Sequence, residues 1–93
     1  MYVDTIDLKD LLLKQTTVDT SSLTITEDLE LESDLELDFL DIVEICIVID
    51  EKHNILIPNE EIEKFKTVKD MVDSIKSKYM KKNPNIDEIW FGF

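Results

Sequence analysis

Residues 34–51, with the sequence DLELDFLDIVEICIVIDE, decide the fold. Their content of Ile and Val favours a strand. Asp38 and Asp41, however, stand three residues apart, as an N-cap and an acid in the positively polarised first turn of a helix do. Apolar residues follow at helical spacing in one row (Ile42, Ile45, Cys46, Ile49, with His53 at its end) and in a second (Leu40, Val43, Ile47). We therefore predict a helix buried on most of its circumference.

This helix leaves an acidic face for water or for a partner. Clustered charge of one sign costs self-repulsion, yet most charge runs are simply solvated surface. Both interpretations stay open, and a calcium loop is disfavoured because no Gly stands at the required turn. The candidate partner-binding residues are Asp38, Phe39, Leu40, Asp41, Glu44, Asp50 and Glu51.

The segment before this stretch predicts a first helix and a long loop. Residues 4–15 carry an apolar leucine face, and Asp4 or Thr5 can cap them. In residues 23–37 apolar side chains alternate with polar ones, which is typical of a strand. No second clear strand is available to pair with them, and a lone strand leaves its backbone groups unsatisfied. We expect a loop pinned to the core by its leucines.

Two more helices are predicted after the central one. Residues 59–65 form a short helix that Asn59 can cap. Residues 67–79 open on the capping pair Thr67 and Asp70, and their apolar positions fit one helix face: Val68, Met71, Val72, Ile75 and Tyr79.

Charge and composition limit the classes of function. The 93 residues suit one domain, and the net charge is −12. Residues 27–51 hold eleven acids and no base, whereas seven Lys lie from Lys64 onward. An acidic half repels nucleic acid and attracts protein partners that carry a basic patch.

The sequence predicts a monomeric cytoplasmic protein. No apolar run approaches the roughly 18 to 20 residues that span a bilayer, and acids stand near the N-terminus where a secretory signal carries Lys or Arg. Cys46 is alone, so no internal disulfide forms, and it reads as a small buried hydrophobe. His53 reads as a core or rim imidazole.

The central stretch resembles the acyl carrier proteins, whose signature is an aspartate, a serine and a leucine opening an acidic second helix. Asp38, Phe39 and Leu40 match this triplet, and the match continues through residues 57–61 and 67–68, so that it covers roughly residues 4–80. With the capping signals, the resemblance implies an all-α four-helix bundle of three longer helices and one short one, with a long first loop.

Phe39 is the departure, because it stands where the family carries the serine that accepts phosphopantetheine. A phenyl ring has no oxygen to join to a phosphate, so we predict no cofactor, and Ser21, Ser22 and Ser33 lack the flanking motif. The resemblance then implies a carrier-like docking module in fatty acid or polyketide-type metabolism. The alternative is a functional carrier of a phosphopantetheine thioester arm, with Phe39 an altered or atypical attachment position.

Phe39 itself has two interpretations: an apolar residue that packs along the helix, or an aromatic anchor for a partner. An enzyme is not expected, because no base and nucleophile stand at a suitable spacing.

The domain is expected to span residues 1–80 and to be followed by a tail, residues 81–93, beyond the resemblance. The tail ends in three aromatic residues. They cap the core, form a short binding peptide, or plug the acyl cavity that a carrier leaves open. The residues concerned are Trp90, Phe91 and Phe93.

Overall fold

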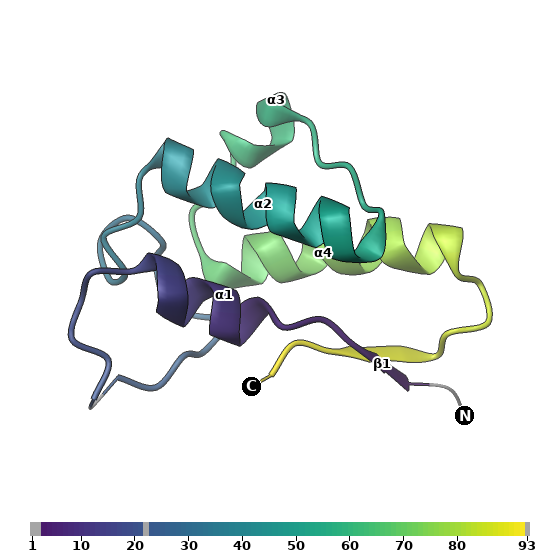
Figure 1. Cartoon of the computed structure of the whole chain (residues 1–93), viewed down its shortest axis with the longest axis horizontal. Coiled ribbons are helices and arrows are strands. Elements are labelled where there is room, and N and C mark those ends of the chain that lie inside the picture. Colours follow the sequence, from purple (N-terminus) through teal and green to yellow (C-terminus); the bar gives the residue numbers. More distant parts are fainter. Residues whose placement is uncertain (1–2, 22, 93) are drawn as a thin grey trace.

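The computed structural model of the chain describes residues 3–21 and 23–92 and confirms the predicted helical bundle. The element order is β1 (Val3–Thr5), α1 (Leu8–Gln15), α2 (Phe39–His53), α3 (Asn59–Ile62), α4 (Val68–Lys82) and β2 (Glu88–Trp90). Helices α1, α2 and α4 run roughly along the long axis, with short α3 beyond α2 and the two strands on the opposite side (Figure 1). Among the described residues, no helix is long and apolar enough to cross a membrane.

Two helices start where their capping residues predicted. The Asp38 carboxylate accepts a hydrogen bond from the Asp41 N–H, and the Asp41 carboxylate accepts one from the Asp38 N–H. Thr67 and Asp70 form the same reciprocal pair at the start of α4. Each pair satisfies two N–H groups that the helix itself leaves without partners. All five apolar positions predicted for α4 are buried.

Two predicted helix starts are wrong. Asp4 and Thr5 do not cap α1 but belong to β1, and α1 begins at Leu8 after Asp7, whose side chain makes no capping hydrogen bond. Asn59 is the first residue of α3 rather than its cap, because Pro58 holds the cap position. Proline suits this position because its fixed φ fits a helix entry.

The long loop between α1 and α2 is pinned as predicted. Several of its inward side chains are buried, and among its described residues the only β-type pairing is an isolated bridge between Glu30 and Thr67, where the Leu31 N–H donates to the Lys66 carbonyl and the Val68 N–H to the Leu29 carbonyl. Buried loop residues are Ile25, Leu31, Leu35 and Leu37.

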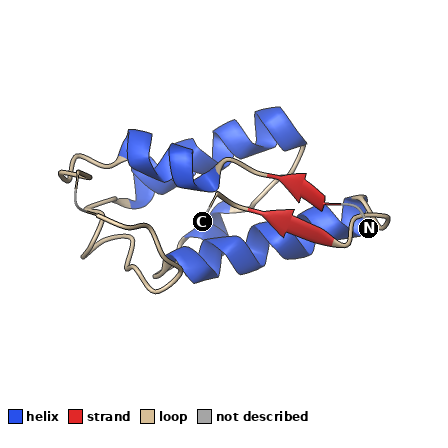
Figure 2. Ribbon diagram, turned by 90° about the horizontal axis from the view of Figure 1, so that it is seen from below, coloured by secondary structure: helices blue, strands red, loops and turns tan. Residues whose placement is uncertain are grey.

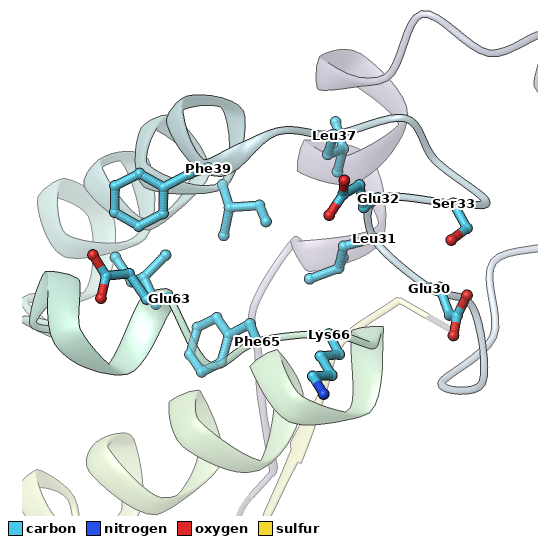
Figure 3. Close-up of a pocket in the computed structure, with 11 residues that line it drawn as sticks. Glu30, Leu31, Glu32, Ser33, Leu37, Phe39, Glu63, Phe65 and Lys66 are labelled. Carbon is cyan, nitrogen blue, oxygen red and sulfur yellow. The ribbon is translucent and has the colours of Figure 1, made fainter.

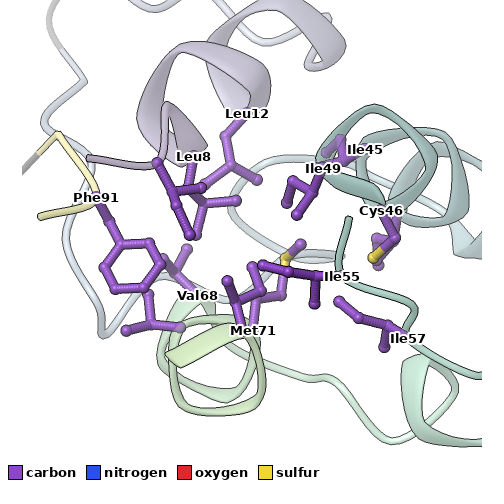
Figure 4. Packing of buried hydrophobic residues seen from close by; sticks show 14 of the residues in the cluster. Leu8, Leu12, Ile45, Cys46, Ile49, Ile55, Ile57, Val68, Met71 and Phe91 are labelled. Atoms are coloured by element: carbon purple, nitrogen blue, oxygen red, sulfur yellow. The ribbon is translucent and has the colours of Figure 1, made fainter. Parts of the chain in front are cut away.

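One apolar core joins the helices, the loop and the tail (Figure 4). Leu8 and Leu12 of α1 meet Ile45 and Ile49 of α2, while Met71 of α4 closes the core from below. Cys46 is buried there as expected, and burial raises the pKa of its thiol to about 12. A thiol this hard to ionise is a poor nucleophile at neutral pH.

The tail returns to the start of the chain. Strand β2 pairs with β1 in parallel, with Val3 opposite Glu88 and Thr5 opposite Trp90 (Figure 2). Ile86, Ile89 and Phe91 are buried in the core, whereas Trp90 is exposed; Phe93 lies outside the described residues. Of the expected roles, Phe91 therefore takes the one of packing on the core, while Trp90 faces solvent.

A polar contact between the first strand and α4 accompanies this pairing. The Tyr79 hydroxyl donates a hydrogen bond to the Asp4 carboxylate, and this bond is the main reason that the pKa of Asp4 is lowered. The centroids of the His53 and Tyr79 rings lie 5.9 Å apart and the two rings are nearly perpendicular, which places His53 at the rim of the core as expected. Tyr79 of α4 therefore holds β1, which in turn pairs with β2.

Candidate functional site

The candidate site lies at the N-terminal end of α2, where Phe39 is the first helical residue. Its side chain is 38% exposed and forms one wall of a pocket of about 320 Å³. The other apolar walls come from Leu31, Leu37, Ile42, Ile62 and Phe65. Phe39 is therefore neither buried in the core nor projected freely into solvent.

Gln15 at the end of α1 fixes the acids in the first turns of α2. Its side-chain amide donates to the Asp41 carboxylate at 3.0 Å and to the Glu44 carboxylate at 2.6 Å. The pKa of Asp41 is lowered, chiefly by this hydrogen bond and then by the Asp38 N–H. Because an amide carries no charge, it orients both carboxylates without neutralising them.

In the part of the chain that the structure describes, no acid on the acidic face of α2 forms a salt bridge. The two salt bridges there join Lys69 to Asp73 and Lys78 to Glu61, away from this face. Asp38, Glu44 and Glu51 are exposed, and Asp41 and Asp50 are partly exposed. A basic partner could thus approach them without first breaking a salt bridge within the chain.

The second apolar row of α2 corrects the sequence prediction. Leu40 is 69% exposed and Ile47 is 51% exposed, while Val43 is only partly buried against the core. The helix is therefore buried on one side only. The periodicity of the sequence indicates two apolar rows on this helix. It does not show whether another helix or loop covers each row. We call Leu40, Val43 and Ile47 the apolar stripe.

A shallow hollow continues the apolar stripe towards α3. It measures about 290 Å³ and is lined by Val43, Ile47 and Asp50 of α2 together with Leu56 and Ile57 of the following loop, among others. Leu56 is 73% exposed. Of the predicted partner-binding residues, Asp50 lines this hollow, whereas Phe39 lines the pocket at the start of α2 and Asp41 and Glu44 bond to Gln15 of α1.

Three contributors to this region were missed from the sequence. Gln15 lies 26 residues before Asp41, and nothing in its local pattern marks it as a partner of α2. Phe65 stands at the end of the predicted helix 59–65 and Leu56 lies two residues before Pro58, and the sequence marks neither as a site residue. Their exposure depends on how the loop after α2 folds back, which periodicity does not report. Among residues 3–21 and 23–92, no group of three or more potential metal ligands comes together.

Comparison with known proteins gives relatives and structures of one kind, although no family model matches the sequence. The acyl carrier protein of Wolinella succinogenes is 38% identical over 71 residues, which cover 76% of this chain and 91% of that protein. The acyl carrier protein of Lactobacillus acidophilus is 40% identical over 70 residues, covering 75% of this chain and 85% of the relative.

Solved structures agree on the fold. The acetyl actinorhodin acyl carrier protein of Streptomyces coelicolor superposes with a TM-score of 0.68 at 20% identity, over 82% of this chain and 90% of that chain. The acyl carrier protein of Thermotoga maritima gives a TM-score of 0.61 at 22% identity, over 83% and 95%.

The helical bundle with its long first loop has the fold of the acyl carrier proteins. With relatives of this identity and coverage, the chain belongs to the acyl carrier protein family.

Proposed function

We propose that this chain is a carrier-family domain without an attached arm, which acts in the cytoplasm as a monomeric docking module for enzymes of fatty acid or polyketide-type metabolism. The single observation that carries the proposal is Phe39 as the first residue of α2, where the family pattern has its serine. Loading needs an oxygen that attacks a phosphorus atom, and the ring offers none.

The alternative is a functional carrier loaded with phosphopantetheine at another hydroxyl. Ser33 is the candidate that the geometry favours, because it is exposed and lines the same pocket as Phe39. It lies in a loop, however, and not at the start of a capped helix, and it lacks the family's flanking residues. Ser22 lies outside the described residues.

Docking is supported by the combination of charge and apolar area on one side of α2. Unpaired carboxylates attract a basic patch over distance and orient it. Burying the exposed side chains of the apolar stripe then adds binding energy, at roughly 25 cal/mol for each Å² removed from water. A merely solvated helix face would not need exposed Leu40 and Ile47.

The test is affinity capture from the source organism with the tagged chain, followed by identification of the captured proteins. We expect an enzyme of fatty acid or polyketide-type metabolism, with capture that weakens as salt rises. The double variant Glu44→Gln/Glu51→Gln should reduce this capture, and Leu40→Ala/Ile47→Ala should reduce it without changing the net charge.

The matched control is Glu27→Gln/Glu88→Gln, which removes the same charge from exposed positions outside α2. Asp38 and Asp41 are left intact because they cap the helix. Capture that ignores salt and responds equally to both double charge variants would reject docking through this face.

A further inference from the structure

The pocket beside Phe39 is made by three separate parts of the chain (Figure 3). Phe39 lies on one side at the start of α2, and Phe65 lies below it in the turn after α3. Leu31 and Leu37 of the long loop close the far side. The rings of Phe39 and Phe65 and the side chains of Leu31 and Leu37 thus line a space of about 320 Å³.

The rim of this pocket is acidic. Glu30 and Glu32 stand on the loop and Glu63 at the end of α3, and all three are exposed. None of them forms a salt bridge within residues 3–21 and 23–92. Lys66 is the one cation in the lining, so three carboxylates against one ammonium leave the rim at −2. An aromatic interior and an uncompensated negative rim are complementary to an extended cation.

We propose that this pocket receives a single arginine side chain of the docking partner. The aliphatic stem of the arginine would lie against Leu31 and Leu37. Its guanidinium would stack on Phe39 or Phe65 and donate hydrogen bonds to the rim carboxylates. Guanidinium groups are favoured on aromatic faces because they are planar and weakly hydrated. The residue that replaces the family's serine would then serve recognition.

Other occupants match the lining less well. A phosphate or a free carboxylate would meet the net negative rim. A wholly apolar group would cover the rim carboxylates without giving them hydrogen-bond partners, which is unfavourable. The space is at the small end of the range for ligand pockets, about 300 Å³, and thus suits one side chain rather than a helix.

The inference rests on the proposed docking function but is tested without a partner. The probe is N-acetyl-arginine amide, titrated into the ¹⁵N-labelled full chain and followed by amide chemical shifts. The control probe is N-acetyl-citrulline amide, which has nearly the same shape and no charge. We expect saturable shifts at residues 30–33, 39 and 63–66 with the arginine probe and none that saturate with citrulline.

Variants then distinguish binding of the arginine probe in this pocket from general attraction of a cation to an acidic protein. Phe39→Leu keeps an apolar wall without a ring and should weaken the arginine probe about two- to five-fold, as expected for a cation–aromatic contact at an exposed site. Glu63→Gln should weaken it as well, while Glu88→Gln, which removes an exposed charge on β2, should not. Because Phe39 is partly exposed, the fold should survive its replacement.

Shifts that spread evenly over the acidic surface, or that centre on Glu44, Asp50 and Glu51, would overturn the arginine pocket and leave the proposed docking face standing. Equal shifts from both probes, or an unchanged affinity in Phe39→Leu and Glu63→Gln together, would overturn it too. Partner capture that ignores salt and responds equally to Glu44→Gln/Glu51→Gln and to the control Glu27→Gln/Glu88→Gln would reject docking itself, and leaves this titration unaffected.

Discussion

Asp38 and Asp41 each serve two purposes at the start of α2. Their carboxylates accept the backbone N–H groups that open the helix, and they also begin the acidic face. A capping carboxylate is held by the helix end whether or not a partner is present. The first turn of α2 is therefore expected to keep its geometry in the absence of any arm at position 39.

Replacing the cap should cost stability in proportion to the lost hydrogen bond. Asp38→Ala is expected to lower the free energy of unfolding by about 1 kcal/mol, while Asp38→Asn, which can still accept from the Asp41 N–H, should lose less. Urea denaturation followed by circular dichroism measures both. Equal losses in the two variants would show that the side-chain acceptor is not what matters at this position.

Asp70 gives a prediction about pH. The N–H groups of Lys66 and Thr67 lower the pKa of its carboxyl in the folded protein. A lowered folded pKa means stability that is present above the unfolded value, about 3.9, and is lost as pH falls through the folded value. The destabilisation by Asp70→Asn should therefore be largest above about pH 5 and shrink below about pH 4. A pH-independent difference in denaturation midpoint would contradict this.

At the scale of elements, the helices could be predicted from the sequence and the strands could not. Helices α2 and α4 were predictable because caps and periodicity are local signals. The pairing of β1 with β2 was not, since it joins the two ends of the chain and each strand has only three residues. The same limit explains the error at Asp4 and Thr5, whose capping character is overridden by a partner more than 80 positions away.

The candidate site, too, could be predicted from the sequence only in part. Its position and its acids followed from the sequence, because the capping pair fixed the helix start and the charge run is continuous. The exposure of the apolar stripe and the walls supplied by Phe65 did not, because both depend on which elements reach α2. A buried helix and a half-buried docking helix have the same apolar periodicity when the exposed row is kept apolar.

The tail offers a comparison between neighbouring residues. Phe91→Ala should destabilise the protein by about 3 to 5 kcal/mol, because it removes a buried ring from the core. Trp90→Ala, one residue earlier and 55% exposed, should change stability by no more than about 0.5 kcal/mol. Thermal melts of both variants, with Phe91→Leu as a milder replacement, check the ranking. A larger loss of stability for Trp90→Ala than for Phe91→Ala would contradict the burial of Phe91 and the exposure of Trp90.

For the whole molecule, the dominant property is the charge of −12 on a small bundle. The described residues contain two salt bridges, so most acids repel one another without local compensation. Self-repulsion of this kind weakens a compact state and is relieved by screening. The same field is what would draw in a partner with a basic patch.

Salt should accordingly stabilise the free protein while it weakens docking. The Debye length falls from about 30 Å at 0.01 M salt to about 3 Å at 1 M, so the melting temperature should rise over that range. Calorimetry in sodium chloride measures this. A melting temperature that falls with salt would mean that favourable charge pairs outweigh repulsion in this fold.

The central property proposed for this chain is a carrier fold that cannot be loaded at position 39. The most direct measurement is the intact mass of the purified chain after incubation with a phosphopantetheinyl transferase and coenzyme A, alongside Phe39→Ser. We predict no added mass on the natural chain; an arm gained by Phe39→Ser would show that the surrounding surface is still recognised, and none would show that it has diverged as well. An arm found on the natural chain would contradict the account.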